Sequence, residues 1–101
     1  MTSTDTYIFT QRPFKPIGAH TTNATLSSAV TLTIPANATK LLMQAITQNV
    51  RITLDNTTPT ATVGFQLRAG DPAVVIPIAV GTVIKVIEET ATATIQYQFG
   101  N

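Results

Sequence analysis

The stretch that decides the fold is "VRITLDNTTPTATVGFQLRAGDP", residues 50–72. Its first six residues alternate between apolar and polar, with Val50, Ile52 and Leu54 on one side. The alternation returns in "VGFQL", residues 63–67, after a run of Asp, Asn, Thr and Pro. A period of two residues is typical of a half-buried β-strand, and the residues between the two runs favour turns. The stretch therefore predicts two strands joined by a shaped loop.

Outside this stretch the chain is patterned in the same way. The segments "VTLTIP" (30–35) and "ATATIQYQFG" (91–100) alternate, whereas "AVVIPIAV" (73–80) and "VIKVIEE" (83–89) are more continuously apolar and are expected to be buried or interfacial. Pro77 cannot donate a ladder hydrogen bond, so its strand is expected at a sheet edge or to be broken there. The apolar residues expected to face inward are Val30, Leu32, Ile34, Val50, Ile52, Leu54, Val63, Phe65, Leu67, Ala93, Ile95, Tyr97 and Phe99.

One segment, "KLLMQAITQ" (40–48), is also compatible with a helix, because Leu42, Ala45 and Ile46 have helical spacing. It is shorter than three helical turns and lies between strands, so a strand is predicted. Turn signals separate seven or eight short strands along the chain. This pattern predicts an all-β fold: an antiparallel β-sandwich, jelly-roll-like, with an extended N-terminal arm.

Residues 1–28 differ from the sandwich domain expected at 29–101. They contain two prolines, many Thr and Ser, and three of the six aromatic residues, Tyr7, Phe9 and Phe14. Proline excludes helix and favours an extended backbone. Two interpretations stay open: a first strand followed by a surface loop, or an arm that docks its aromatic side chains on a neighbouring copy.

Composition excludes several classes of protein. Formal net charge is +1 and 11% of residues are charged, so the clustered Lys and Arg of a nucleic-acid-binding protein are missing. The absence of Cys removes disulfides, zinc-thiolate sites and thiol nucleophiles. The absence of Cys also fits a protein made in a reducing cytoplasm. No apolar run is long enough to span a bilayer, and the N-terminus lacks the pattern of a secretory signal. Threonine, 20 of 101 residues, predicts a neutral, hydrogen-bonding exterior suited to contact with other proteins.

The charged residues of the deciding stretch are candidates for structure rather than catalysis. Asp55 and Asp71 stand where turns begin and are expected to accept backbone hydrogen bonds there. Arg51 and Arg68 lie on the polar sides of their strands and are expected to pair with carboxylates across the sheet or to contact a partner subunit. Glu88 and Glu89 are expected to end their strand and face solvent.

No enzyme signature is present. His20 has no carboxylate within ten residues, and neither a nucleophile motif nor a phosphate-binding loop occurs. A hard-cation site built from Asp55, Asn56 and Asp71 lacks the expected ligand spacing. We expect no catalysis, no cofactor and no metal.

Three short motifs resemble a recurring class of small β proteins of tailed double-stranded DNA phages. They are a "V-R-[apolar]-T-[apolar]-D" strand at 50–55, a "T-x-P-T-x-x-x-G" loop and an "L-x-A-G-[DE]-P" turn at 67–72. In this chain the loop motif begins at Thr58 and ends in the glycine at position 64. The resemblance covers about residues 30–99 and implies a virion structural protein.

Within that class, the resemblance implies first a decoration (cement) protein on the capsid surface, with the major capsid protein as partner and a dimer or trimer as the oligomer. The expected partner-binding residues are Tyr7, Phe9, Phe14, Arg51 and Arg68. Two alternatives remain: a carbohydrate- or receptor-binding sandwich on a tail or head fibre, and a head–tail connector component.

Overall fold

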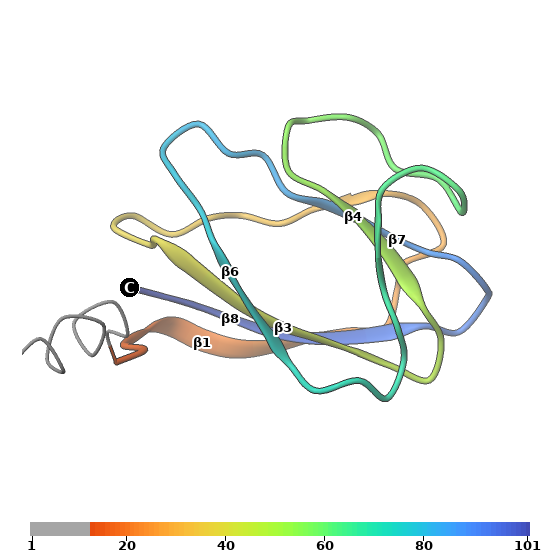
Figure 1. Cartoon of the computed structure of the whole chain (residues 1–101), viewed down its shortest axis with the longest axis horizontal. Coiled ribbons are helices and arrows are strands. Elements are labelled where there is room, and N and C mark those ends of the chain that lie inside the picture. The colour runs from red at the N-terminus through yellow and green to blue at the C-terminus, as the bar shows by residue number, and fades with distance from the viewer. Residues whose placement is uncertain (1–12) are drawn as a thin grey trace, which may run out of the picture.

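The computed structural model describes residues 13–101, which form eight strands and no helix. The strands lie in two layers that face each other (Figure 1). Their bounds are β1 (Pro16–Asn23), β2 (Val30–Thr31), β3 (Lys40–Ile46), β4 (Val50–Thr53), β5 (Phe65–Leu67), β6 (Val74–Pro77), β7 (Lys85–Glu88) and β8 (Thr94–Gly100). The predicted all-β sandwich is confirmed, and residues 40–46 form a strand as expected.

Both sheets have four strands, and all their strand pairs are antiparallel. The first sheet has the order β1-β8-β3-β6 and the second has the order β2-β7-β4-β5. The chain therefore changes sheets at every connection except the one from β4 to β5. The residues 1–12, which include Tyr7 and Phe9, lie outside the part of the chain that the structure describes.

The core fills the space between the two inner faces. In β8 the residues predicted to face inward, Ile95, Tyr97 and Phe99, are buried or half-buried, and in β3 the fully buried residues are Leu41, Met43 and Ala45. The buried apolar side chains are Leu26, Leu32, Leu41, Met43, Ala45, Val50, Ile52, Ile78, Ile84, Val86, Ala93, Ile95 and Phe99. Tyr97 is half-buried, and its ring meets that of Phe99 edge-on at a centroid distance of 6.0 Å. Burial of this apolar surface is the main favourable contribution to folding.

Three residues depart from the predicted inside–outside alternation: Val63, Phe65 and Thr53. Val63 was expected to face inward, but it lies in the loop before β5 and 45% of it is exposed. Phe65 stands opposite Ile52 in the register and so faces the core side of its sheet, yet 72% of it is exposed. The reason is that β5 is a three-residue edge strand, and the other sheet does not cover its end. Thr53 was expected to point to solvent but is buried, because the loop after β4 folds over it and accepts its hydroxyl hydrogen bond at the Thr57 carbonyl.

Proline occupies both edges of the first sheet. Pro16 and Pro77 lie in the same cross-strand row, which also contains Gly100 and Lys40. The backbone N–H of Ile78 donates to Thr39, so alternate residues of β6 turn their N–H groups toward β3 and Pro77 is at a position that faces the free edge. The expected edge position of Pro77 is confirmed. Proline is tolerated there because the N–H that it lacks would have pointed to solvent.

Candidate interaction surface

Of the predicted partner-binding residues, Phe14 packs against its own chain. It is half-buried, and it lies so close to Gly100 that a Cβ added to that glycine would be 2.6 Å from its ring. Backbone hydrogen bonds in both directions between Lys15 and Asn101 continue the ladder of β1 and β8 past Pro16. The described part of the N-terminal segment is therefore fixed to the end of β8, and Pro13 is where residues 1–12 join the domain.

Arg51 belongs to a network on the outer face of the second sheet. Its Nε lies 2.6 Å from a carboxylate oxygen of Glu89, and its Nη1 donates to the Gly64 carbonyl at 3.0 Å. Gln66 donates to the same carboxylate oxygen at 2.8 Å. The network thus connects β4, the start of β5 and the residue after β7. It confirms pairing across the sheet, but the carboxylate is that of Glu89, and Asp55 plays no part in it.

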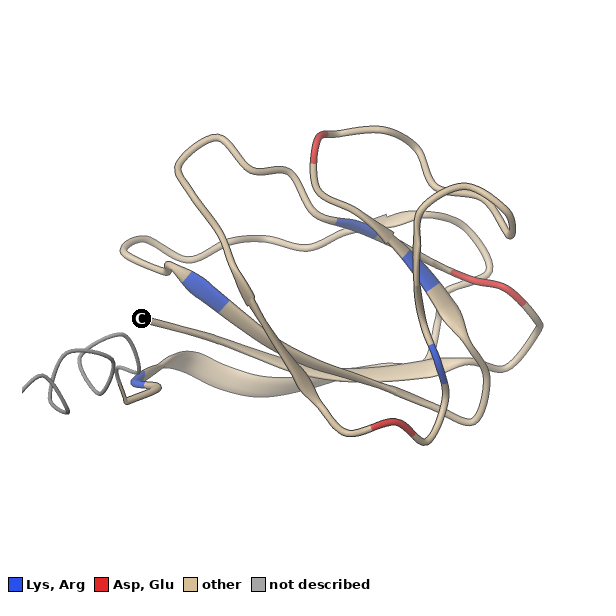
Figure 2. Cartoon of the chain, viewed as in Figure 1, with Lys and Arg blue, Asp and Glu red and all other residues tan. Residues whose placement is uncertain are grey.

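This environment changes the acidity of Glu89. The hydrogen bond from Gln66 is the largest cause, and the neighbouring Arg51 adds to it, so the pKa of the Glu89 carboxyl lies below its ordinary value of 4.5. Glu89 was expected to face solvent, and the structure instead places it in the one ion pair found within residues 13–101. Figure 2 shows the charged residues spread over both sheets and their loops.

The two predicted turn carboxylates differ. Asp55 accepts the backbone N–H of Thr57 at 3.1 Å, and hydrogen bonding from Thr57 lowers the pKa of the Asp55 carboxyl. Its predicted capping role is what the geometry shows. At Asp71 the turn is closed by backbone instead: its N–H donates to the Arg68 carbonyl, with Gly70 at φ 85° between them. Arg68 itself is exposed beside this turn.

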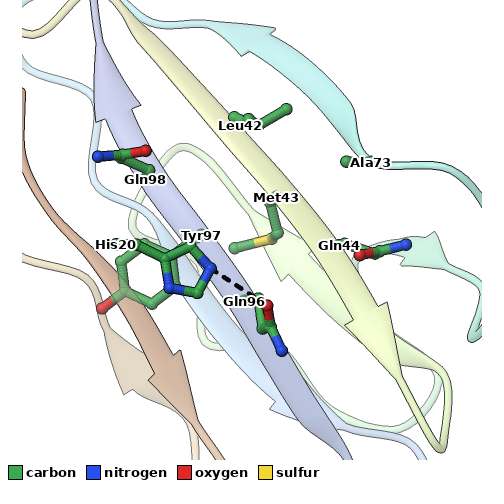
Figure 3. Close-up of a pocket in the computed structure, with 8 residues that line it drawn as sticks. All are labelled: His20, Leu42, Met43, Gln44, Ala73, Gln96, Tyr97 and Gln98. Carbon is green, nitrogen blue, oxygen red and sulfur yellow. Dashed lines mark hydrogen bonds between the residues drawn. The ribbon is translucent and has the colours of Figure 1, made fainter. Parts of the chain in front are cut away.

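The outer face of the first sheet carries a cluster of amides. Gln44 and Gln96 stand directly opposite each other on β3 and β8. Gln98 lies two residues farther along β8, on the same face and opposite Leu42. The His20 ring and the Gln96 amide are 3.1 Å apart, as the dashed line in Figure 3 shows. The side chains surround a depression of about 110 Å³, which is smaller than the roughly 300 Å³ at which small-molecule sites begin.

The Gln98 amide also bonds to an irregularity in β1. Between Ile17 and Thr21 the register of β1 against β8 shifts, so that three residues of β1 oppose Gln98 alone. Gln98 donates its side-chain amide to the Gly18 carbonyl at 3.1 Å, and Gly18 has a φ of 77°. The amide cluster thus has a local structural role in holding the bulge.

Exposed apolar side chains gather on the strands of one edge of the sandwich. Phe65 is 72% exposed at the start of β5, and Val63 precedes it. On β6, Val74 and Val75 are exposed, whereas Ile76 and Ile78 pack toward the core. The apolar run 73–80 was expected to be buried or interfacial, and its valines are on the surface. No pattern in the sequence marks these residues as exposed, because their exposure depends on which strands lie at the edges of the two sheets.

Neither a cluster of metal ligands nor a membrane-spanning helix is present within residues 13–101. No three His, Asp or Glu residues of this part of the chain gather where they could hold a metal ion. No helix there is long and apolar enough to cross a membrane.

No protein-family model, curated protein or solved structure matches the chain.

Proposed function

We propose that this chain is a virion structural protein of a tailed double-stranded DNA phage, and specifically a decoration protein that binds the outer capsid surface. The observation that carries the proposal is the exposed ring of Phe65 at a sheet edge, in a chain of which only 11% is charged; it offers a surface for assembly with other protein copies, as in an oligomeric virion component. Contiguous exposed apolar side chains indicate a protein–protein contact. The motifs at 50–55, 58–64 and 67–72 supply the phage class by resemblance.

The strand order supports a jelly roll as the finer description of the sandwich. Four antiparallel pairs join β1 to β8, β2 to β7, β3 to β6 and β4 to β5. The chain thus has the connectivity of one long hairpin whose tip is the β4–β5 loop, rolled into two sheets. Viral capsid and lectin domains both use this fold, so the fold agrees with the proposal but does not choose between these roles.

The proposed mechanism is stabilisation by binding. A protein that binds the assembled shell and not its separated subunits lowers the free energy of the shell by mass action. A symmetric oligomer of the chain multiplies the contacts, so that individually weak contacts act together. Residues 1–12 join the domain beside β1, at the opposite edge from β5. Tyr7 and Phe9 of that segment are the residues that we assign to the capsid contact.

Co-sedimentation with capsids that lack the protein tests this function. We expect saturable binding at a ratio that matches positions of the capsid lattice. The variant Tyr7→Ala/Phe9→Ala should bind at least about tenfold more weakly, since two large aromatic anchors are worth more than ~1.4 kcal/mol at an interface. The matched control Thr6→Ala/Thr10→Ala changes the same segment and should bind like the unaltered chain. Absence of saturable binding would refute the decoration role.

A second function is favoured by the amide cluster. Gln44, Gln96 and Gln98 present donors and acceptors on one outer sheet face, which is the chemistry that recognises sugar hydroxyls. The cluster has no aromatic platform, because Tyr97 and Phe99 face the core. A glycan array with the Gln44→Ala/Gln96→Ala variant as control separates this fibre-type role from decoration: binding that this variant loses would favour it.

A further inference from the structure

We propose that the free edge of β5 is a self-complementary contact through which two copies of this chain pair antiparallel, joining their second sheets across a two-fold axis. The proposal specifies how copies of the chain associate, so it rests on the part of the proposed function that calls for a homo-oligomer. It does not require capsid binding, so the two proposals can fail separately.

The direction of the backbone groups in β5 follows from its neighbours. Asn49 precedes β4 and Glu89 follows β7, and the register of the two strands places them opposite each other. The N–H of Glu89 donates to the carbonyl of Asn49 at 3.0 Å. Because backbone groups alternate in direction along a strand, Val50 and Ile52 then turn theirs toward β5. Their partners Leu67 and Phe65 bond back to β4. Gln66 therefore directs both its N–H and its C=O to the free edge.

A two-fold axis at Gln66 satisfies both of these groups at once. In an antiparallel pair, two residues directly opposite each other can exchange both backbone hydrogen bonds. With Gln66 opposite Gln66 of the second copy, Phe65 of each chain stands opposite Leu67 of the other. The exposed ring of Phe65 then packs on an aliphatic side chain, a pairing that stabilises antiparallel strands. The residue opposite Arg68 is Gly64, so no like charges meet.

The start of β5 is held in place for such a contact. Gly64 has a φ of 125°, and a Cβ there would lie 3.1 Å from the Ile52 carbonyl oxygen. The Gly64 carbonyl accepts a hydrogen bond from Arg51, and the Gln66 side chain is anchored on Glu89. The backbone of β5 is thereby fixed on β4, and little ordering of the strand is needed when a second copy binds.

The other three edges are less suited to this pairing. Pro16 on β1 and Pro77 on β6 lack the N–H that a neighbouring strand would use, and β1 also carries the bulge. β2 has two residues and exposes no large apolar side chain. β5 combines an available N–H, an available C=O and the most exposed aromatic side chain of residues 13–101. Of the four sheet edges, β5 is therefore the one best suited to pair with a second copy of the chain.

Sedimentation velocity of the full chain, from about 1 to 100 µM, tests the proposal, since a contact of this small size gives weak affinity. We expect a reversible monomer–dimer equilibrium. Gln66→Pro removes the edge N–H at a position where proline is compatible with the fold and should raise the dimer dissociation constant at least about tenfold. The matched control Gln66→Ala keeps the backbone N–H and loses only the side-chain hydrogen bond to Glu89. It should still dimerise.

A second variant distinguishes loss of the contact from misfolding caused by the proline. Phe65→Thr keeps a strand-forming residue, removes the exposed ring, and should also shift the equilibrium to monomer with an unchanged circular dichroism spectrum. Hydrogen exchange adds a direct readout, because the Gln66 amide should be protected only at dimer-forming concentrations. A monomer throughout the range, a trimer, or dimerisation that both Gln66→Pro and Phe65→Thr leave intact would overturn the proposal.

Discussion

Thr47 and Thr92 both adopt a left-handed backbone conformation that β-branched residues rarely take, with φ values of 70° and 73°. They lie in adjacent loops, and the Thr47 hydroxyl donates to the Thr92 carbonyl at 2.7 Å. The Thr47 hydroxyl thus compensates part of the strain at Thr47, and both residues are exposed.

We expect Thr92→Gly to stabilise the protein by about 1 kcal/mol, because glycine adopts this conformation without strain. In a domain of this size that corresponds to a rise of roughly 4–8 °C in Tm. Thr47→Gly is the matched comparison: it relieves the same strain but deletes the hydroxyl hydrogen bond, so its gain should be smaller. Thermal unfolding measures both, and an unchanged or lower Tm for Thr92→Gly would show that Thr92 has a stabilising contact in solution.

The carboxyl of Glu89 should make stability depend on pH. Its pKa is lowered in the folded protein, so the unfolded chain binds a proton more readily as pH falls. Stability from this group is therefore complete above its ordinary pKa of 4.5 and is lost as pH falls below that value. Urea unfolding at pH 7 and at pH 3.5 should show a smaller acid loss in Glu89→Gln than in the unaltered chain. Equal losses would mean that the Arg51–Gln66 network does not favour the charged form.

At the level of elements, the two edge prolines of the first sheet should limit association. Pro77→Thr restores an N–H that faces the free edge of β6 and replaces proline by a good strand former. We expect the variant to form higher-order species that the unaltered chain does not form, measured by light scattering over time at high concentration. Pro13→Thr, outside the strands, is the control and should not associate. If both variants stay as soluble as the unaltered chain, the absence of an edge N–H is not what protects this sheet.

The elements also show what the sequence could and could not predict. Alternation located β4 and β8 because their inner faces are covered by the opposite sheet, so that periodicity and burial agree, whereas β3 was predicted from its length and its position between strands. It failed for Phe65 because burial at an edge depends on the extent of the facing sheet, which no local pattern encodes. Of the candidate residues, the turn role of Asp55 follows from its neighbours. The pairing of Arg51 with Glu89 depends on a contact across 38 residues of chain and became visible only with the register.

For the whole molecule, the pairing of β1 with β8 brings the two ends of the described chain together. Ile17 stands opposite Phe99, and backbone hydrogen bonds between Lys15 and Asn101 close the sheet at that end. The sequence alone divided the chain at residue 28, with the sandwich expected at 29–101. The structure places β1, at 16–23, as a full strand of the first sheet.

A truncation series tests which boundary defines the folding unit. A chain that begins at Pro13 keeps all eight strands and should unfold cooperatively with nearly the stability of the full chain. A chain that begins at residue 24 lacks β1, so β8 loses one of its two ladder partners and becomes a sheet edge, and Phe99 loses Ile17 opposite it. The loss of an edge strand and of its apolar contacts is large against the roughly 5–15 kcal/mol that hold a domain folded, and it opens a new sheet edge, so we expect a chain that is unfolded or aggregated. Circular dichroism and urea unfolding of both chains decide the matter: if the shorter chain folds with the stability of the longer one, β1 is an appendage and the sandwich begins after it.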